Sequence, residues 1–314
     1  MASIRFKNVY LDISKTISSN NERVDSTYKI GDYFDGEKTV ELVEEKLQKK
    51  VINELRKDNK IDLLIGSDLS NQLGITNKVA SDINIPYLGV YSACSSYIEE
   101  LILAASLLNS SSIKSVACLV SSHNLDSERT YRYPIEYGSI TRNTQTFTAT
   151  GAVASLITKK ETNIQIESAT IGKVVDYGVK DANNMGAVMA PGAAETLINH
   201  LKDLKRDISY YDIVITGDLG KIGSKLFLTI LSKNDITIKK YIDAGSILIQ
   251  NESLTHQGAS GPICLPLVFI EKILKEKKYK RVLLIGTGAL FNTTMVNQKR
   301  TLPCISHIVS LEVK

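Results

Sequence analysis

The sequence has few cysteines and only a small excess of positive charge. Each of these two features excludes a class of protein. Cys94, Cys118, Cys264 and Cys304 form no C-x-x-C pair and stand near no histidine pair at zinc spacing. The sequence therefore predicts neither a disulfide framework nor a metal site, and it fits a reducing, intracellular compartment. The 38 Lys and Arg nearly balance the 34 Asp and Glu and are interleaved with them. Because no basic stripe marks a groove, nucleic acid is not an expected partner.

Long apolar runs are also missing. The first twenty residues have no apolar core of about 7–15 residues and no cleavage-like end, and no later stretch reaches the roughly 18 apolar residues of a membrane span. We therefore expect a soluble chain, which still leaves docking on a membrane protein open. At 314 residues and 43% hydrophobic content, the chain can bury a core without disulfides or structural metal.

What the sequence does contain is an internal repeat. Ile61–Leu69 (IDLLIGSDL) aligns with Tyr211–Leu219 (YDIVITGDL), and Asp68 thereby matches Asp218. Each run is a short apolar strand that ends in a turn of small residues, and the same order of elements follows in both copies. Two β-α-β-α-β units predict parallel sheets with helices on their faces, because parallel strands need crossover connections.

The pattern also predicts the bounds of individual elements. Apolar residues three and four apart predict a helix with a charged outer face within Glu37–Lys60. In the second copy the predicted helices are Gly223–Ser232 and Pro262–Lys275, and the predicted strands are Ser246–Ile249 and Arg281–Gly286. Between the copies, Arg129–Gly192 is richer in polar residues and turns, as loops that carry sites often are.

Cys94 is the first candidate for chemistry. It lies in GVYSACSSYIEELILAAS, where an apolar strand stops at small residues and a long apolar helix begins. A helix N-terminus lowers the pKa of a thiol and binds anions through backbone N–H groups, here those of Ser95 and Ser96. The alternative is a small buried cysteine at a strand end, without chemistry.

His123, Arg129 and Arg132 follow the next apolar strand. If that strand is parallel to the one before Cys94, both end at the sheet edge where open α/β sheets bind ligands. Arginine forks suit carboxylates. The alternative for the arginines is surface ion pairing with neighbouring glutamates.

The second copy offers Asp218 and Ser260 at the positions that match Asp68 and Cys94. Ser260, in QGASGPIC, follows no obvious base, and an isolated serine there is more often a helix cap than a nucleophile. The short match GTG at 286–288 is no dinucleotide fingerprint, and no phosphate loop is present.

Together, the duplicated element order, a cysteine at the strand-to-helix turn and a small-residue loop at the matching turn resemble the thiolase superfamily. Within it, the chain resembles the stage V sporulation protein AD family in YSACSS around Cys94, SSHN at 121–124, ERTYRYPIEYG at 128–138, ATIGKV at 169–174, NMGAVMAP at 184–191, TGDL at 216–219 and GTGAL at 286–290. The resemblance implies a thiolase-like α/β fold of two similar halves in α/β/α/β/α layers. Residues 1–175, with the inserted loop region, would form one half and residues 176–314 the other.

The resemblance also implies that acyl-condensing chemistry is incomplete here. Relatives of the ketoacyl-synthase III type combine a cysteine with a histidine and an asparagine of the second half, whereas the strand at 212–216 leads to Asp218 without a histidine. Gln257 is nearest the asparagine's place, and His256 is a candidate substitute base. We therefore expect a protein that is not an enzyme, with Cys94 as a vestigial nucleophile. The alternative is a thiolase or ketoacyl-synthase III-type acyltransferase that uses Cys94 covalently.

By the same resemblance, the chain is expected to bind dipicolinic acid (pyridine-2,6-dicarboxylate) for uptake into the developing spore, without a cofactor. This ligand needs donors for two carboxylates and an apolar slot for its ring. The candidate binding residues are Cys94, Ser95, Ser96, His123, Arg129, Arg132, Met185, Asp218, His256, Gln257 and Ser260. The ligand could arrive as its calcium chelate, although no loop has calcium-ligand spacing.

The implied partners and location follow from the family too. They are integral membrane subunits of the same uptake system, a homodimer as is common among thiolase relatives, and a peripheral position on the spore inner membrane.

Overall fold

The two halves of the chain build matching sets of strands. The computed structural model describes residues 2–132 and 142–314, without the side chain of Arg132. The first set has the order β5-β4-β6-β8-β2 and the second the order β11-β10-β13-β14-β9. Their bounds are β2 (Tyr10–Ser18), β4 (Leu63–Ser67), β5 (Tyr87–Gly89), β6 (Ser115–Ser122), β8 (Gly151–Thr158), β9 (Ile164–Ile171), β10 (Ile213–Thr216), β11 (Tyr241–Asp243), β13 (Arg281–Ala289) and β14 (Cys304–Val313).

Strand directions also agree between the sets. They confirm that the strands of each repeated β-α-β-α-β unit are parallel, while two further strands of each set join by antiparallel pairing. β4 is parallel to β5 and β6, as β10 is to β11 and β13. β8 is antiparallel to β6 and β2, as β14 is to β13 and β9. The sequence repeat covers only the three parallel strands of each set, so it carried no signal for the antiparallel pair.

Among the described residues, the two sets join into one sheet of twelve strands where Tyr10 and Leu11 of β2 pair with β9. β1 (Ala2–Arg5) pairs with β9, and β3 (Tyr28–Lys29) pairs with β2. A separate two-stranded sheet contains β7 (Phe147–Thr148) and β12 (Ala259–Ser260). The chain thus crosses between the sets more than once, and the division after residue 175 stays a prediction.

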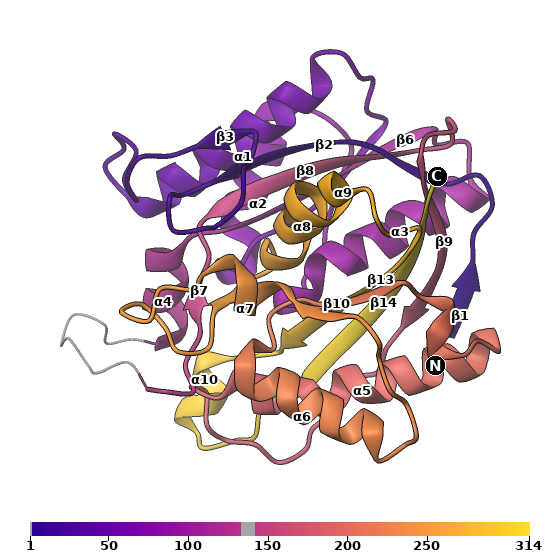
Figure 1. The fold of residues 1–314 in the computed structure, drawn as a ribbon. Helices are drawn as coiled ribbons and strands as arrows, with labels where there is room; N and C mark the ends of the chain where they lie inside the picture. The colour runs from indigo at the N-terminus through magenta and orange to yellow at the C-terminus, as the bar shows by residue number, and fades with distance from the viewer. Residues whose placement is uncertain (1, 133–141) are drawn as a thin grey trace.

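Helices cover both faces of each set, which gives the expected five layers (Figure 1). The outer layers contain α1 (Val40–Arg56) and α2 (Gly74–Ile83) on the first set, and α5 (Met185–Leu204) and α6 (Gly220–Ser232) on the second. The middle layer contains α3 (Ser96–Ser110) and α8 (Cys264–Val268), which continues through a π-helical turn at Phe269–Ile273 into α9 (Leu274–Glu276). Shorter helices are α4 (Asn124–Arg132), α7 (Ala244–Leu248) and α10 (Thr293–Asn297).

Alternating strand residues connect these layers. On β6, Cys118 packs in the middle core with α3, whereas Ala117 and Leu119 pack in the outer core with α1. On β13, Leu284 packs in the middle core and Leu283 packs with α5 and α6. Burial on both faces explains why these strands read as continuous apolar runs.

One predicted element has the wrong type. Ser246–Ile249 was expected to be a strand, but α7 occupies this segment and the strand, β11, lies just before it. Asp243 explains the difference, because its carboxylate accepts a hydrogen bond from the N–H of Ser246 at 3.0 Å and caps the helix.

Candidate functional site

The turn that carries Cys94 is fixed by neighbouring groups. Ala93 has a φ of +52°, in the left-handed region that residues with a Cβ rarely adopt. The hydroxyl of Ser96 accepts a hydrogen bond from the N–H of Ser92 at 3.0 Å and donates one to the carbonyl of Ala93 at 2.8 Å. Cys94 is thereby held just before α3, partly exposed. Backbone strain of this kind gathers at functional sites.

Asp218, just after β10, is the polar partner of Cys94. Its fully buried carboxyl accepts hydrogen bonds from the N–H of Gly261 at 2.9 Å and the hydroxyl of Thr287 at 2.7 Å, and it also hydrogen-bonds the Cys94 thiol. Burial raises the pKa of Asp218 to about 7, despite these donors. Near neutral pH this acid is therefore partly protonated.

Cys94 lines a pocket at the ends of the parallel strands of both halves. The pocket encloses about 400 Å³, its open mouth included. Its wall is largely apolar, and its hydroxyl-bearing residues include Ser127, Thr148 and Ser260. The lining residues are Leu69, Tyr91, Ala93, Cys94, Ser127, Tyr131, Thr148, Met185, Ser260, Gly261, Ala289 and Phe291.

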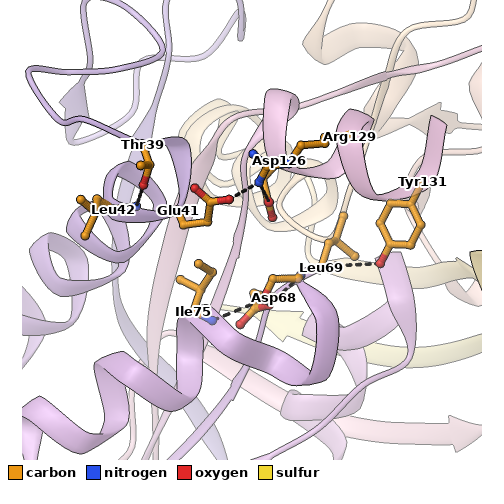
Figure 2. Close-up of polar contacts among 10 residues, drawn as sticks. Thr39, Glu41, Leu42, Asp68, Leu69, Ile75, Asp126, Arg129 and Tyr131 are labelled. Carbon is orange, nitrogen blue, oxygen red and sulfur yellow. Dashed lines mark hydrogen bonds and ion pairs between the residues drawn. The ribbon is translucent and has the colours of Figure 1, made fainter. Parts of the chain in front are cut away.

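Aromatic side chains form one wall. Tyr131 and Phe291 meet edge to face, with ring centroids 5.2 Å apart. The Tyr131 hydroxyl donates to the carbonyl of Leu69 at 2.6 Å, a contact that Figure 2 shows, and lies 3.0 Å from the hydroxyl of Tyr91. These contacts fix the tyrosine ring of α4 against the turn that follows β4.

Three of the residues predicted from the sequence line this pocket. They are Cys94, Met185 and Ser260, and Asp218 lies directly beside them through its contact with Cys94. The two copies of the repeat are therefore brought together at their matching turns. Met189, four residues after Met185 on α5, is buried in the outer core instead.

Ser95 and Ser96 adjoin Cys94 in sequence but do not line the pocket. Ser96 closes the turn, as described above. The hydroxyl of Ser95 is buried against β13, where a Cβ placed on Gly286 would come within 2.6 Å of it. The side chains of Ser95 and Ser96 therefore stabilise the turn and do not line the pocket.

The candidates between β6 and the end of α4 have other partners. Nε2 of His123 lies 2.8 Å from the carbonyl oxygen of Tyr33, on the side of the N-terminal segment. The half-exposed Arg129 pairs with Glu41 at the surface and with the buried Asp126 (Figure 2). This arrangement is the surface ion pairing that the sequence left as the alternative, although with different acids. Arg132 ends α4, and its side chain lies outside the described residues.

Gln257 has a structural position, not one in the pocket. Its side chain accepts a hydrogen bond from the N–H of Ile222 at 2.9 Å and donates one to the carbonyl of Asn143 at 2.6 Å. It therefore ties the start of α6 to a loop. Its neighbour His256 is exposed and does not line the pocket.

None of the four histidines lines the pocket with Cys94. Burial lowers the pKa of His200 to about 3 and that of His307 to about 4, so both are neutral at physiological pH. Within the described ranges, no group of three or more His, Cys, Asp or Glu side chains is placed to hold a metal ion.

Sequence reasoning missed the aromatic wall and Ser127. A usable signal was present, because Ser127 and Tyr131 are four residues apart and so share one face of a helix. Phe291 follows directly on the GTGAL string, where only its position after a strand hinted at the pocket.

Comparison with known proteins identifies the family. The family model for stage V sporulation protein AD (SpoVAD) matches residues 20–312. The chain is also 39% identical over 285 residues to stage V sporulation protein AD of Bacillus subtilis (strain 168), covering 88% of this chain and 84% of that protein. The chain belongs to the stage V sporulation protein AD family.

Solved structures similar to this SpoVAD-family chain have the thiolase-like fold. A variant of OleA from Xanthomonas campestris superposes with a TM-score of 0.66 at 14% identity and covers 98% of each chain. The 3-oxoacyl-[acyl-carrier-protein] synthase III of Aquifex aeolicus VF5 gives a TM-score of 0.58 at 14% identity, covering 97% of this chain and 99% of that one. This similarity confirms the predicted fold.

Proposed function

We propose that the chain is the dipicolinic-acid-binding component of a spore uptake machinery and that it is not an enzyme. Membership of the sporulation family supports the biological setting. The pocket supports the chemistry, because an apolar, partly aromatic slot with several hydroxyl groups suits a flat ring that carries two carboxylates.

The observation that carries the proposal is the partner of Cys94. A condensing cysteine needs a base that takes up its proton and a positive partner for its thiolate. Here the thiol hydrogen-bonds Asp218, a buried acid, and no histidine lines the pocket. Such a pair favours a thiol that contacts a ligand over one that attacks it.

The proposed contacts divide between ring and carboxylates. Met185, Tyr131 and Phe291 pack against the ring, while hydroxyl and thiol groups, including those of Cys94 and Ser260, meet carboxylate oxygens. Arg132 remains a candidate for the second carboxylate from its place at the end of α4. The proposal includes no cofactor, and it leaves both the free acid and its calcium chelate as ligand forms.

A calorimetric titration of the chain with dipicolinate tests the proposal. We expect saturable binding of dipicolinate at one site per chain. An acyl thioester should not compete with dipicolinate for this site. The matched measurement is the intact mass of the protein after incubation with acetyl- or malonyl-coenzyme A. No heat with dipicolinate, together with a stable mass increase on Cys94, would overturn the proposal.

That outcome would support the alternative, an acyltransferase that uses Cys94. One observation favours it, namely the strained Ala93 turn that presents the thiol just before a buried helix. A Cys94→Ala variant that no longer gains mass would then locate the acyl group.

We also propose a peripheral position on the spore inner membrane, held by integral subunits of the same uptake system, with a homodimer as the assembly. Within residues 2–132 and 142–314, no helix is long and apolar enough to cross a membrane. Washing spore inner membranes with high salt or alkali should release the chain. Resistance to both washes would contradict peripheral binding.

A further inference from the structure

Ser127 presents a buried hydroxyl group without a hydrogen-bond partner at the wall of the pocket. The residue is 2% exposed, and its Oγ finds no donor or acceptor among the described residues. A serine inside a helix commonly donates to the carbonyl four residues earlier. In α4 the carbonyl of His123 accepts only the N–H of Ser127, at 3.0 Å.

The position of this hydroxyl points to a ligand. Buried polar groups are nearly always paired, and an exception in a native fold requires an explanation. Ser127 lies on the α4 wall that also carries Tyr131, and the pocket opens between this wall and the residues around Cys94 and Ser260. A molecule in the pocket would therefore supply the hydrogen-bond acceptor that no described residue provides.

We propose that Ser127 is a specificity-determining residue whose hydroxyl donates a hydrogen bond to a carboxylate oxygen of the bound ligand. This inference rests on the proposed function, since it takes dipicolinate as the ligand. It adds a donor on the α4 wall, separate from the Cys94 turn. One flat dicarboxylate can then contact both walls at once.

The chain offers a matched control in Ser95. Its hydroxyl is equally buried and equally without a partner, but it packs against β13 and does not line the pocket. Ser95→Ala and Ser127→Ala therefore remove the same group from similar burial. They differ in whether the residue lines the pocket.

The experiment is a calorimetric titration with dipicolinate of the native chain and both variants, beside their melting temperatures. We expect Ser127→Ala to lose roughly 10- to 100-fold in affinity, as befits a hydrogen bond to a charged group. Ser95→Ala should bind as the native chain does. Both variants should melt at or above the native temperature, because each loses an unsatisfied buried hydroxyl.

The outcomes separate this inference from the function on which it rests. Suppose that the native chain binds dipicolinate. If Ser127→Ala then binds as tightly as the native chain, or if Ser95→Ala loses as much affinity as Ser127→Ala, the role of Ser127 is overturned and the proposed function is not. Absence of dipicolinate binding by the native chain overturns the proposed function and this inference with it. A loss confined to Ser127→Ala, without unfolding, supports both.

Discussion

At the scale of single residues, the Cys94–Asp218 contact decides how reactive the thiol is. Alkylation requires the thiolate, and an acid beside a thiol gives that anion no stabilisation of the kind a protonated imidazole gives. The other three cysteines are buried. We expect Cys94 to react with iodoacetamide at pH 7 no faster than a free cysteine, as followed by mass spectrometry. The unfolded chain, in which all four cysteines react, is the control. Alkylation at the rate of a catalytic thiolate would favour the acyltransferase.

Asp218 predicts a pH dependence of ligand binding. Its pKa is raised to about 7, so the acid loses its proton across neutral pH. A dianion binds better beside the neutral acid than beside the carboxylate. We therefore expect dipicolinate affinity to fall by up to about tenfold between about pH 6 and 8, the limit for one linked proton.

An Asp218→Asn variant tests this assignment by calorimetry at several pH values. The amide stays neutral, so affinity should be nearly constant over the same range. If the variant keeps the native pH dependence, another group is responsible.

At the scale of elements, α5 and α6 touch backbone to backbone where Gly186 meets Gly223. A Cβ on Gly223 would lie 2.8 Å from the Cα of Gly186, and one on Gly186 would lie 2.3 Å from the carbonyl of Leu219. We expect Gly223→Ala to lower the free energy of unfolding by about 1–3 kcal/mol in urea denaturation, because the helices must separate.

The same substitution should also weaken ligand binding, since Met185 of the pocket precedes Gly186 on α5. Gly31→Ala is the control, because a Cβ there meets nothing within 4 Å. Equal stability of the two variants would show that the helices can move apart at no cost.

The agreement between the predicted and the observed structure differs from element to element. Helix α6 ends at the predicted Ser232 and strand β13 begins at the predicted Arg281, because their apolar patterns are clear. α7 was mistaken for a strand, because four apolar or small residues carry no period and the cap at Asp243 decides the outcome. Arg129 was a candidate for a ligand carboxylate, yet it pairs with Asp126 and with Glu41, which is 88 residues away. Such pairs appear only once the fold is known.

At the scale of the whole molecule, two buried acids make stability depend on pH. Glu44 and Glu100 are almost fully buried, and each accepts a hydrogen bond of 2.6 Å, from Ser121 and Ser67 respectively. Burial raises the pKa of both well above the ordinary value of 4.5. The folded chain therefore keeps two protons that the unfolded chain releases.

Below about pH 4.5 both states are protonated, and above it each group lowers the free energy of unfolding by up to about 1.4 kcal/mol per pH unit until its folded pKa is reached. We expect Glu44→Gln and Glu100→Gln to flatten the fall of melting temperature between about pH 5 and 8. Glu252→Gln, at an exposed site, is the control and should change nothing. If the melting temperatures of Glu44→Gln and Glu100→Gln depend on pH as that of the native chain does, both acids ionise inside the fold.

The pairing of β1 with β9 has a consequence for the order in which the chain is made. Ser3 and Thr170 share a hydrogen bond across 167 positions, and β9 is also the strand that joins the two sets and pairs with the C-terminal β14. During synthesis on the ribosome, β1 therefore has no strand to pair with until β9 has emerged, which is after more than half of the chain. The second set cannot close until β14 has emerged. Contacts this distant slow folding, so the edges of the early strands stay unpaired during translation, when such edges can pair with other chains.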